Sequence, residues 1–289
     1  MKAGFARVNI TPPLGTKMIG FGGRDKERGC DGVHDDLFVR ALYLEHQGEA
    51  ALILGFDLCF FGRQEVDRYR GALGRALDLA PRRILLNTSH THTGPATSPW
   101  AYAYEKLDAL YLAEIETSMV RAAGMAQSAA RPATLQVGKT RTRLPLSRRM
   151  PDGKGGVEWR PYPRGTICDT LPLCLFKDSR GQPICLLYSV SCHPSTIGGW
   201  QISADYPGVA CNLLDTHLGM TEGGSLFLQG CGGDTMACVI GDGPDEQGAS
   251  RFRRGTWQDV ETAGRIVADE VRTALAAGLQ PVEPALVSR

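Results

Sequence analysis

The chain has 289 residues, of which 43% are hydrophobic and 22% charged, and its formal net charge is +1 at neutral pH. This length and composition allow one large buried core and differ from those of disordered chains. The balanced charge produces no overall field that would attract nucleic acid, and no apolar run reaches the roughly 18 residues of a transmembrane helix. We therefore expect a globular protein with no nucleic-acid partner and no membrane insertion.

The N-terminal residues and the cysteines indicate in which cellular compartment the protein functions. Residues 1–13 lack the apolar stretch of a secretory signal peptide. The nine cysteines form no CxxC pair, and several, such as Cys59, Cys185 and Cys211, lie inside apolar runs. This usage is typical of reduced, buried thiols. We therefore expect a cytoplasmic protein.

Hydrophobic patterns in the first half predict alternating strands and helices. In chain order the predicted elements are a β-hairpin of residues 37–45 and 49–56, a helix over 68–79, a buried strand over 83–87, an amphipathic helix over 107–128 and a strand over 133–143.

Residues 141–164 interrupt this pattern with four prolines and three glycines, which predict a long loop. The segment has seven basic residues and two acidic ones. Two interpretations are open. The segment is either a lid that recognises a carboxylate or phosphate of the substrate, or a solvated loop.

The second half repeats the alternation of strands and helices. Its predicted elements are a hairpin of residues 171–176 and 183–191, a helix from Pro207 to about His217, a strand over 225–229 and a helix over 260–274 that Thr256 can cap. The whole pattern predicts a layered α/β fold, with a mostly parallel or mixed central sheet flanked by helices and with β-hairpins. We detect no internal repeat and no linker, so residues 1–289 are expected to form a single domain.

Three of the six histidines follow predicted strands. His90 and His92 lie two residues apart after the strand over 83–87, and His193 follows the strand over 183–191. Ligands bind at such strand ends in α/β sheets, and imidazole is a common zinc ligand. The pattern predicts one zinc ion or another divalent metal. The alternative is a set of hydrogen-bonded structural histidines, and the spacing leaves open which of His90 and His92 contacts the metal.

Seven short motifs occur in an order that resembles the neutral ceramidases and their bacterial relatives, over roughly residues 3–275. They are Gly32-Val33-His34-Asp35-Asp36-Leu37, Phe56-Asp57, His90-Thr91-His92-Thr93-Gly94-Pro95, Leu146-Ser147-Arg148-Arg149, His193-Pro194-Ser195-Thr196, Ser203-Ala204-Asp205-Tyr206-Pro207-Gly208 and Gln229-Gly230-Cys231-Gly232-Gly233-Asp234.

The resemblance implies a zinc amidohydrolase. It implies that His90 and His193 are zinc ligands, that His92 lies beside the metal and that Arg148 is an active-site arginine. Two departures stand out. Met236 occupies the place of the family's nucleophilic serine, and methionine cannot attack, so we expect metal-activated water as the nucleophile. The family's glutamate and tyrosine ligands belong to a segment that follows the last helix predicted here.

We therefore expect a zinc-dependent hydrolase that cleaves an amide or related bond in a small, anionic substrate. His92 or Asp234 is the expected general base and Arg148 the expected anion or oxyanion contact. Arg149, Asp57 and Asp205 are further expected substrate-binding positions, and Asp57 and Asp234 are the best substitutes for the family's later metal ligands. Turns or helix caps also explain these three aspartates.

Three further possibilities remain open at the level of the sequence. Cys192 or Cys231 is a reactive thiolate or an inert small side chain. The aromatic residues Trp100, Tyr102 and Tyr104 line the pocket or pack elsewhere. The alternative function is a catalytically reduced homologue that binds a metal or a partner and lacks the family's later ligands.

Overall fold

The computed structural model describes residues 1–98, 107–244 and 250–286. Its main feature is a nine-stranded mixed sheet with the order β12-β10-β9-β6-β1-β3-β4-β5, to which β16 adds beside β6. The strands are β1 (Lys2–Asn9), β3 (Phe38–His46), β4 (Glu49–Phe56), β5 (Ile84–Thr88), β6 (Arg131–Arg141), β9 (Thr170–Asp178), β10 (Pro183–Val190), β12 (Gly224–Gln229) and β16 (Gln280–Val282). The helices are α1 (Arg63–Leu77), α2 (Ala109–Ser128), α3 (Asp205–Leu218) and α4 (Trp257–Ala277).

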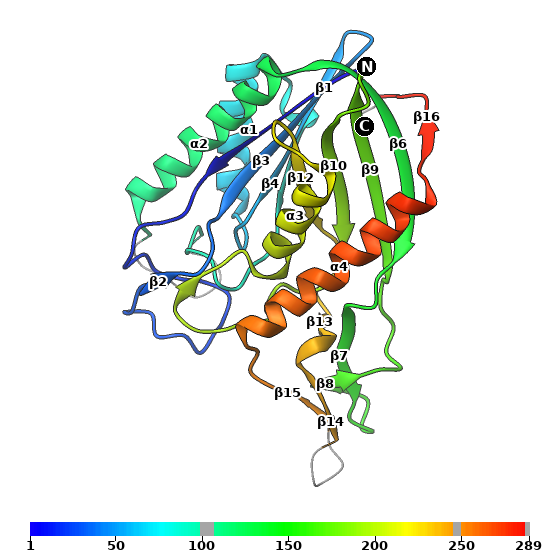
Figure 1. The fold of residues 1–289 in the computed structure, drawn as a ribbon. Coiled ribbons are helices and arrows are strands. Elements are labelled where there is room, and N and C mark those ends of the chain that lie inside the picture. The colour runs from blue at the N-terminus through cyan, green and yellow to red at the C-terminus, as the bar shows by residue number, and fades with distance from the viewer. Residues whose placement is uncertain (99–106, 245–249, 287–289) are drawn as a thin grey trace.

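The sheet has two halves, one of β1, β3, β4 and β5 and one of β6, β9, β10 and β12, which pack against each other. The first half carries α1 and α2 on its outer side and the second carries α3 and α4 (Figure 1). Alternate residues of a strand face opposite sides, so Phe5 and Leu42 point inward while Val8 and Val39 pack under α1 and α2. The inner layer joins both halves through the apolar residues Ala3, Phe5, Leu42, Leu44, Phe176, Ile184, Cys185 and Leu226. The result is a layered α/β fold with a mixed sheet, as the sequence predicts.

The two halves have the same order of elements. In the first, β1, β3 and β4 are antiparallel neighbours, and α1 connects β4 to the parallel strand β5 before α2 follows. In the second, β6, β9 and β10 are antiparallel neighbours, and α3 connects β10 to the parallel strand β12 before α4 follows. The architecture thus repeats although the sequence shows no repeat. Each half contains one parallel pair, and the loops after these pairs form the site.

Both predicted hairpins, the strands and the capped last helix are confirmed, with shifts of a few residues at their ends. Helix α1 begins at Arg63, five residues before the predicted start. No helix in the described ranges is both long and apolar enough to cross a membrane.

The predicted loop over 141–164 is wrong. Most of it forms a hairpin of β7 (Pro145–Pro151) and β8 (Val157–Tyr162), and β7 also pairs with β13 (Thr235–Ala237). Two prolines lie at the ends of β7, and Pro161 lies on the edge strand β8, where a missing N–H is tolerated. The glycines form the turn, where Gly153 and Gly155 have positive φ and the Asp152 carboxylate accepts two backbone N–H groups.

Candidate metal centre

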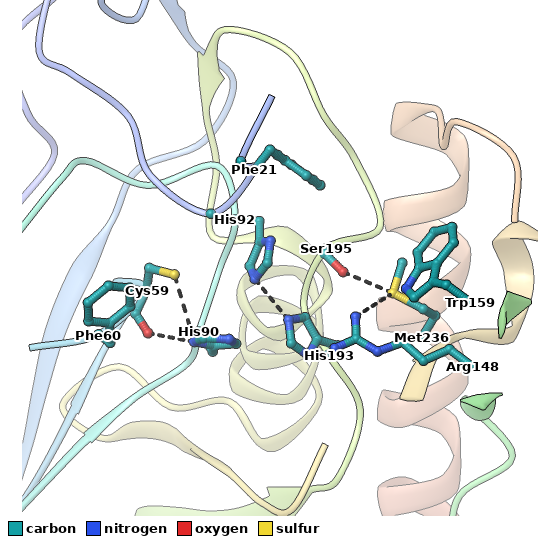
Figure 2. A pocket seen from close by; sticks show the side chains of 12 residues that line it. Phe21, Cys59, Phe60, His90, His92, Arg148, Trp159, His193, Ser195 and Met236 are labelled. Atoms are coloured by element: carbon teal, nitrogen blue, oxygen red, sulfur yellow. Dashed lines mark hydrogen bonds between the residues drawn. The ribbon is translucent and has the colours of Figure 1, made fainter. Parts of the chain in front are cut away.

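Three imidazoles meet at the carboxyl ends of the two parallel strand pairs. His90 and His92 follow β5, and His193 follows β10. The ring centroids are 5.0 Å apart for His90 and His92, and 4.6 Å apart for His193 with each of the others (Figure 2). The structure therefore brings together the three histidines that the sequence singles out.

The alternation of side chains explains the local sequence after β5. His90 and His92 point into the pocket, while Thr91 and Thr93 between and after them are buried. Both threonine hydroxyls donate to the backbone carbonyl of Ser203, at 2.8 and 3.1 Å. This anchoring fixes the segment so that both imidazoles face the same space.

The backbone fixes the tautomers of His90 and His193. Nδ1 of His90 lies 2.8 Å from the carbonyl oxygen of Cys59, and Nδ1 of His193 lies 3.2 Å from that of Gly232. A carbonyl oxygen only accepts, so each Nδ1 carries the proton and each Nε2 keeps its lone pair. A metal-binding histidine usually donates a hydrogen bond of this kind from the ring nitrogen that does not contact the ion.

His90 has a left-handed backbone, with φ 69°. Few residues other than glycine adopt this conformation, and it costs on the order of 1 kcal/mol or more. The hydrogen bond from the His90 N–H to the carbonyl of Leu58, at 2.9 Å, helps to hold the strained position. Strain of this kind is frequent at functional sites.

His92 is the third histidine of the cluster and contacts His193. Its Nε2 lies 2.8 Å from Nε2 of His193, and its Nδ1 is buried with no hydrogen-bond partner among the described residues. Arg24 donates to the His92 carbonyl, and Phe21 packs edge-on against the ring. A side chain at Gly20 would collide with the same ring. These contacts make His92 a fixed wall of the pocket.

The surroundings favour the neutral form of all three imidazoles. Burial is the main cause, and it lowers the pKa of His90 and His193, the latter to about 4. Burial and the neighbouring histidines hold the pKa of His92 well below its ordinary value. The neutral form is the form that binds a metal ion.

Cys59 is a nearby residue that the sequence presents only as a buried thiol. One ligand atom each from Cys59, His90 and His92 lies within 4.8 Å of the others. The Cys59 sulfur is 3.7 Å from Nδ1 of His90, whereas the opposite edge of that ring is turned toward His193 (Figure 2). Burial raises the pKa of this thiol to about 12. We conclude that the imidazoles are the better-oriented donors, and their nitrogens fit zinc or a similar borderline metal.

A pocket of about 400 Å³ opens above the cluster. Besides the histidines, its walls include Arg148, Trp159, Ser195 and Met236. One guanidinium nitrogen of Arg148 donates to the carbonyl of Gly233 at 2.5 Å, and no carboxylate of the described residues forms an ion pair with this side chain. Trp159 lies on β8 with 56% of its surface exposed. Because residues 141–164 were expected to form a loop, the sequence did not indicate Trp159 as a pocket residue.

The other expected site residues lie outside this pocket. Arg149 is exposed and is not part of the pocket wall. The backbone carbonyl of Asp234 accepts from the Arg148 N–H at 2.9 Å, and the Asp234 side chain is not part of the pocket wall. Of the two cysteines, Cys192 is buried with a raised thiol pKa, and Cys231 is exposed. Trp100, Tyr102 and Tyr104 lie outside the described residues.

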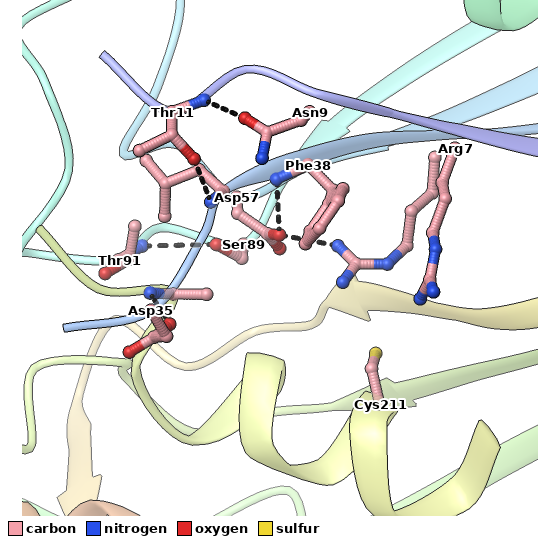
Figure 3. Close-up of polar contacts among 12 residues, drawn as sticks. Arg7, Asn9, Thr11, Asp35, Phe38, Asp57, Ser89, Thr91 and Cys211 are labelled. Carbon is pink, nitrogen blue, oxygen red and sulfur yellow. Dashed lines mark hydrogen bonds and ion pairs between the residues drawn. The ribbon is translucent and has the colours of Figure 1, made fainter. Parts of the chain in front are cut away.

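Asp57 and Asp205 are buried beneath the site. Asp57 accepts hydrogen bonds from the Phe38 N–H and the Arg40 guanidinium, at 2.9 and 2.6 Å (Figure 3). Asp205 is the first residue of α3, and its carboxylate accepts from the N–H groups of Thr196 and Ile197. The Asp205 carboxylate thus supports the loop that carries His193, whereas the Asp57 carboxylate links the end of β4 to β3.

No protein-family model and no curated protein sequence matches the chain. Among solved structures, the chain resembles a neutral ceramidase from Pseudomonas aeruginosa with a TM-score of 0.81 and 18% identity, over 98% of this chain and 46% of that chain. A ceramidase complexed with C2 gives a TM-score of 0.82 and 17% identity, over 98% of this chain and 45% of that chain. The chain spans less than half the length of either protein, and its fold is ceramidase-like.

Proposed function

We propose that the chain is a zinc-dependent hydrolase that cleaves an amide or related bond in a small, anionic substrate. The observation that carries the proposal is the pair of imidazoles of His90, which is partly buried, and His193, which is buried. Backbone carbonyls hold Nδ1 of both rings, so each Nε2 keeps a lone pair that a metal ion can take, and that of His193 faces Nε2 of His92 at 2.8 Å. The ceramidase-like fold supports amide chemistry, because the two similar structures are ceramidases.

His90 and His193 would hold the metal through Nε2. A zinc ion bound there would polarise the scissile carbonyl and lower the pKa of a water molecule. His92 would act as the general base. Its ring borders the same pocket. With the lone pair of His193 Nε2 taken by the ion, His92 Nε2 would no longer need to donate to it and could carry the lone pair that takes the proton of the attacking water and returns it to the leaving nitrogen.

Arg148 would bind the negative charge of the substrate or of the developing oxyanion. The hydrogen bond to the Gly233 carbonyl holds the guanidinium in the pocket wall. Because no described carboxylate forms an ion pair with Arg148, its positive charge can pair with an anionic group of the substrate. Asp234 remains a second candidate for the base, although its carboxylate is not in the pocket wall.

Met236 supports water as the nucleophile. The Met236 thioether is 4% exposed and lines the pocket, where the Ser195 hydroxyl donates to its sulfur at 3.3 Å. This hydroxyl contacts no histidine that could activate it among the described hydrogen bonds. Neither side chain is therefore arranged as a nucleophile.

The metal content of the purified protein tests the proposal. We expect about one zinc per chain, its loss in the His90→Ala/His193→Ala double variant, and no loss in His217→Ala, which changes an exposed histidine at the end of α3. Hydrolysis of a panel of N-acyl compounds is measured alongside. Unchanged metal in the double variant contradicts the site, whereas bound metal without hydrolysis of any compound favours the catalytically reduced homologue.

A further inference from the structure

A second hollow of about 360 Å³ lies beside the pocket. It shares Cys59, Phe60, His90 and His193 with the first pocket, so the two metal-binding imidazoles stand between the two spaces. Its remaining wall comes from the ends of β5 and β12, the parallel strands that end each half of the sheet, and consists of Leu86, Asn87, Thr88, Gln229, Gly230, Gly232 and Gly233.

Gln229 is part of this wall, and its side chain has an unused acceptor. Its Nε2 donates to the carbonyl of Gly230 at 3.1 Å. Its Oε1 is buried and receives no hydrogen bond from any described residue. A buried acceptor without a donor costs on the order of 1–3 kcal/mol. A ligand that supplies a donor would relieve this cost.

The backbone of Gln229 is held in place by Asn87. The Gln229 N–H donates to Asn87 Oδ1 at 2.9 Å, and Asn87 Nδ2 donates to the Gln229 carbonyl at 3.3 Å. This reciprocal pair links the ends of β5 and β12. Both polar ends of the Asn87 amide are thereby occupied, so Gln229 is the residue with spare hydrogen-bonding capacity.

The two spaces differ in charge. Arg148 gives the first pocket a cation. The described wall of the second contains no acidic or basic side chain apart from Cys59, His90 and His193, which both spaces share. An anionic group of the substrate therefore belongs in the first pocket. A neutral, polar group belongs in the second.

We propose that the second hollow is a substrate subsite, in which the Gln229 amide turns from the Gly230 carbonyl toward the ligand and its Oε1 accepts a hydrogen bond from a hydroxyl or similar neutral donor. This inference rests on the proposed function, because it places the scissile bond at the imidazoles between the two spaces. The substrate class is then a small amide with a negative charge on one side of the scissile bond and a neutral hydrogen-bond donor on the other.

Matched ligands test the subsite by binding, independently of turnover. N-succinylethanolamine is compared with N-succinylpropylamine, and N-(3-hydroxypropanoyl)-β-alanine with N-butanoyl-β-alanine, on the zinc-loaded protein by calorimetry or ligand-observed NMR. In at least one pair we expect the hydroxyl compound to bind roughly tenfold more tightly, the effect of one well-placed hydrogen bond.

Three variants assign the preference to the residue. Gln229→Leu should reduce the preference to about onefold. Gln229→Glu should shift it toward N-succinylethylenediamine, whose ammonium group suits a carboxylate. Gln258→Leu changes an exposed glutamine on α4 and should leave the preference unchanged.

The outcomes separate this inference from the proposed function. A hydroxyl preference that depends on Gln229, without hydrolysis of any compound, supports the subsite and contradicts the hydrolase. No hydroxyl preference in the unmodified protein, no measurable binding of the hydroxyl compounds, or a preference that survives both Gln229 variants overturns the subsite.

Discussion

At the scale of single residues, two adjacent arginines with different surroundings give a sharp comparison. Arg148 lines the pocket, whereas Arg149 is exposed and is not part of the pocket wall. Arg148→Ala should weaken binding of anionic substrates by roughly 10–150-fold, the effect of losing one charge-assisted contact of about 1.5–3 kcal/mol. Arg148→Lys should restore only part of it, because lysine lacks the planar fork. Arg149→Ala is the matched control in a KM comparison, and equal effects of the two alanine variants would argue against the assignment.

Met236 gives a second residue-scale prediction. Met236→Leu keeps a similar volume, so we expect a loss of less than about 1.5 kcal/mol in the free energy of unfolding and retention of hydrolysis within a few-fold. Urea unfolding and kcat check the two parts. Mass spectrometry of the stopped reaction should detect no acyl group on the protein, and a stable adduct on Ser195, Thr235 or a cysteine would sink the idea that water attacks.

The sequence predicts some residues of the site better than others. His90, His92 and His193 stand out because they are rare residues at strand ends. Asp57 and Asp205 occupy equally prominent positions, yet both carboxylates face inward to backbone and guanidinium donors. Whether Gln229 Oε1 has a hydrogen-bond donor depends on the orientation of the side chain, which the spacing of residues in the sequence does not reveal.

At the scale of elements, the start of α4 depends on one carboxylate. Asp259 accepts from Thr256 in a capping box and from Arg253 at 2.6 Å, and these donors hold its pKa below the ordinary range. A carboxylate with a lowered pKa adds stability that is present above about pH 4 and is lost as pH falls toward the folded-state pKa. Asp259→Asn should therefore cost about 1–2 kcal/mol at pH 7.

The pH dependence distinguishes this carboxylate from a general effect of charge. The difference between Asp259→Asn and the unmodified protein should shrink when urea unfolding is measured at pH 3 instead of pH 7. Asp269→Asn removes a more exposed carboxylate from the same helix and should cost less than about 0.5 kcal/mol. A cost of Asp259→Asn that is the same at both pH values would contradict the prediction.

The hairpin of β7 and β8 shows why one element escaped prediction. Prolines and glycines are ordinary loop markers, and the segment contains both. Here they occupy strand ends, an edge strand and a tight turn, positions where they do not break pairing. Which strand is an edge depends on the neighbours that it finds in three dimensions. In the main sheet, by contrast, the alternation of hydrophobic residues is enough to identify the strands without knowledge of their neighbours.

At the scale of the whole molecule, the apolar layers are separate from the site. The clusters under α1 and α2 and under α3 and α4 contain none of the three histidines. We therefore expect the chelator-treated protein to remain folded and to unfold cooperatively. Zinc at about 100 times its Kd should add about 2.7 kcal/mol, which raises Tm by roughly 5–10 °C. Loss of near-UV circular dichroism on chelation would show instead that the ion is part of the core.

The repeated order of elements sets a sequence of events during biosynthesis. The ribosome releases the first half, with His90 and His92, before residues 130–193 exist, so a nascent chain at that stage presents an incomplete ligand set. His193 arrives with the second half and reaches the others only after the two halves of the sheet have packed together. Under the proposed function, zinc binding by His90 and His193 together would therefore follow the packing of the two halves, and the ion would report that they have joined.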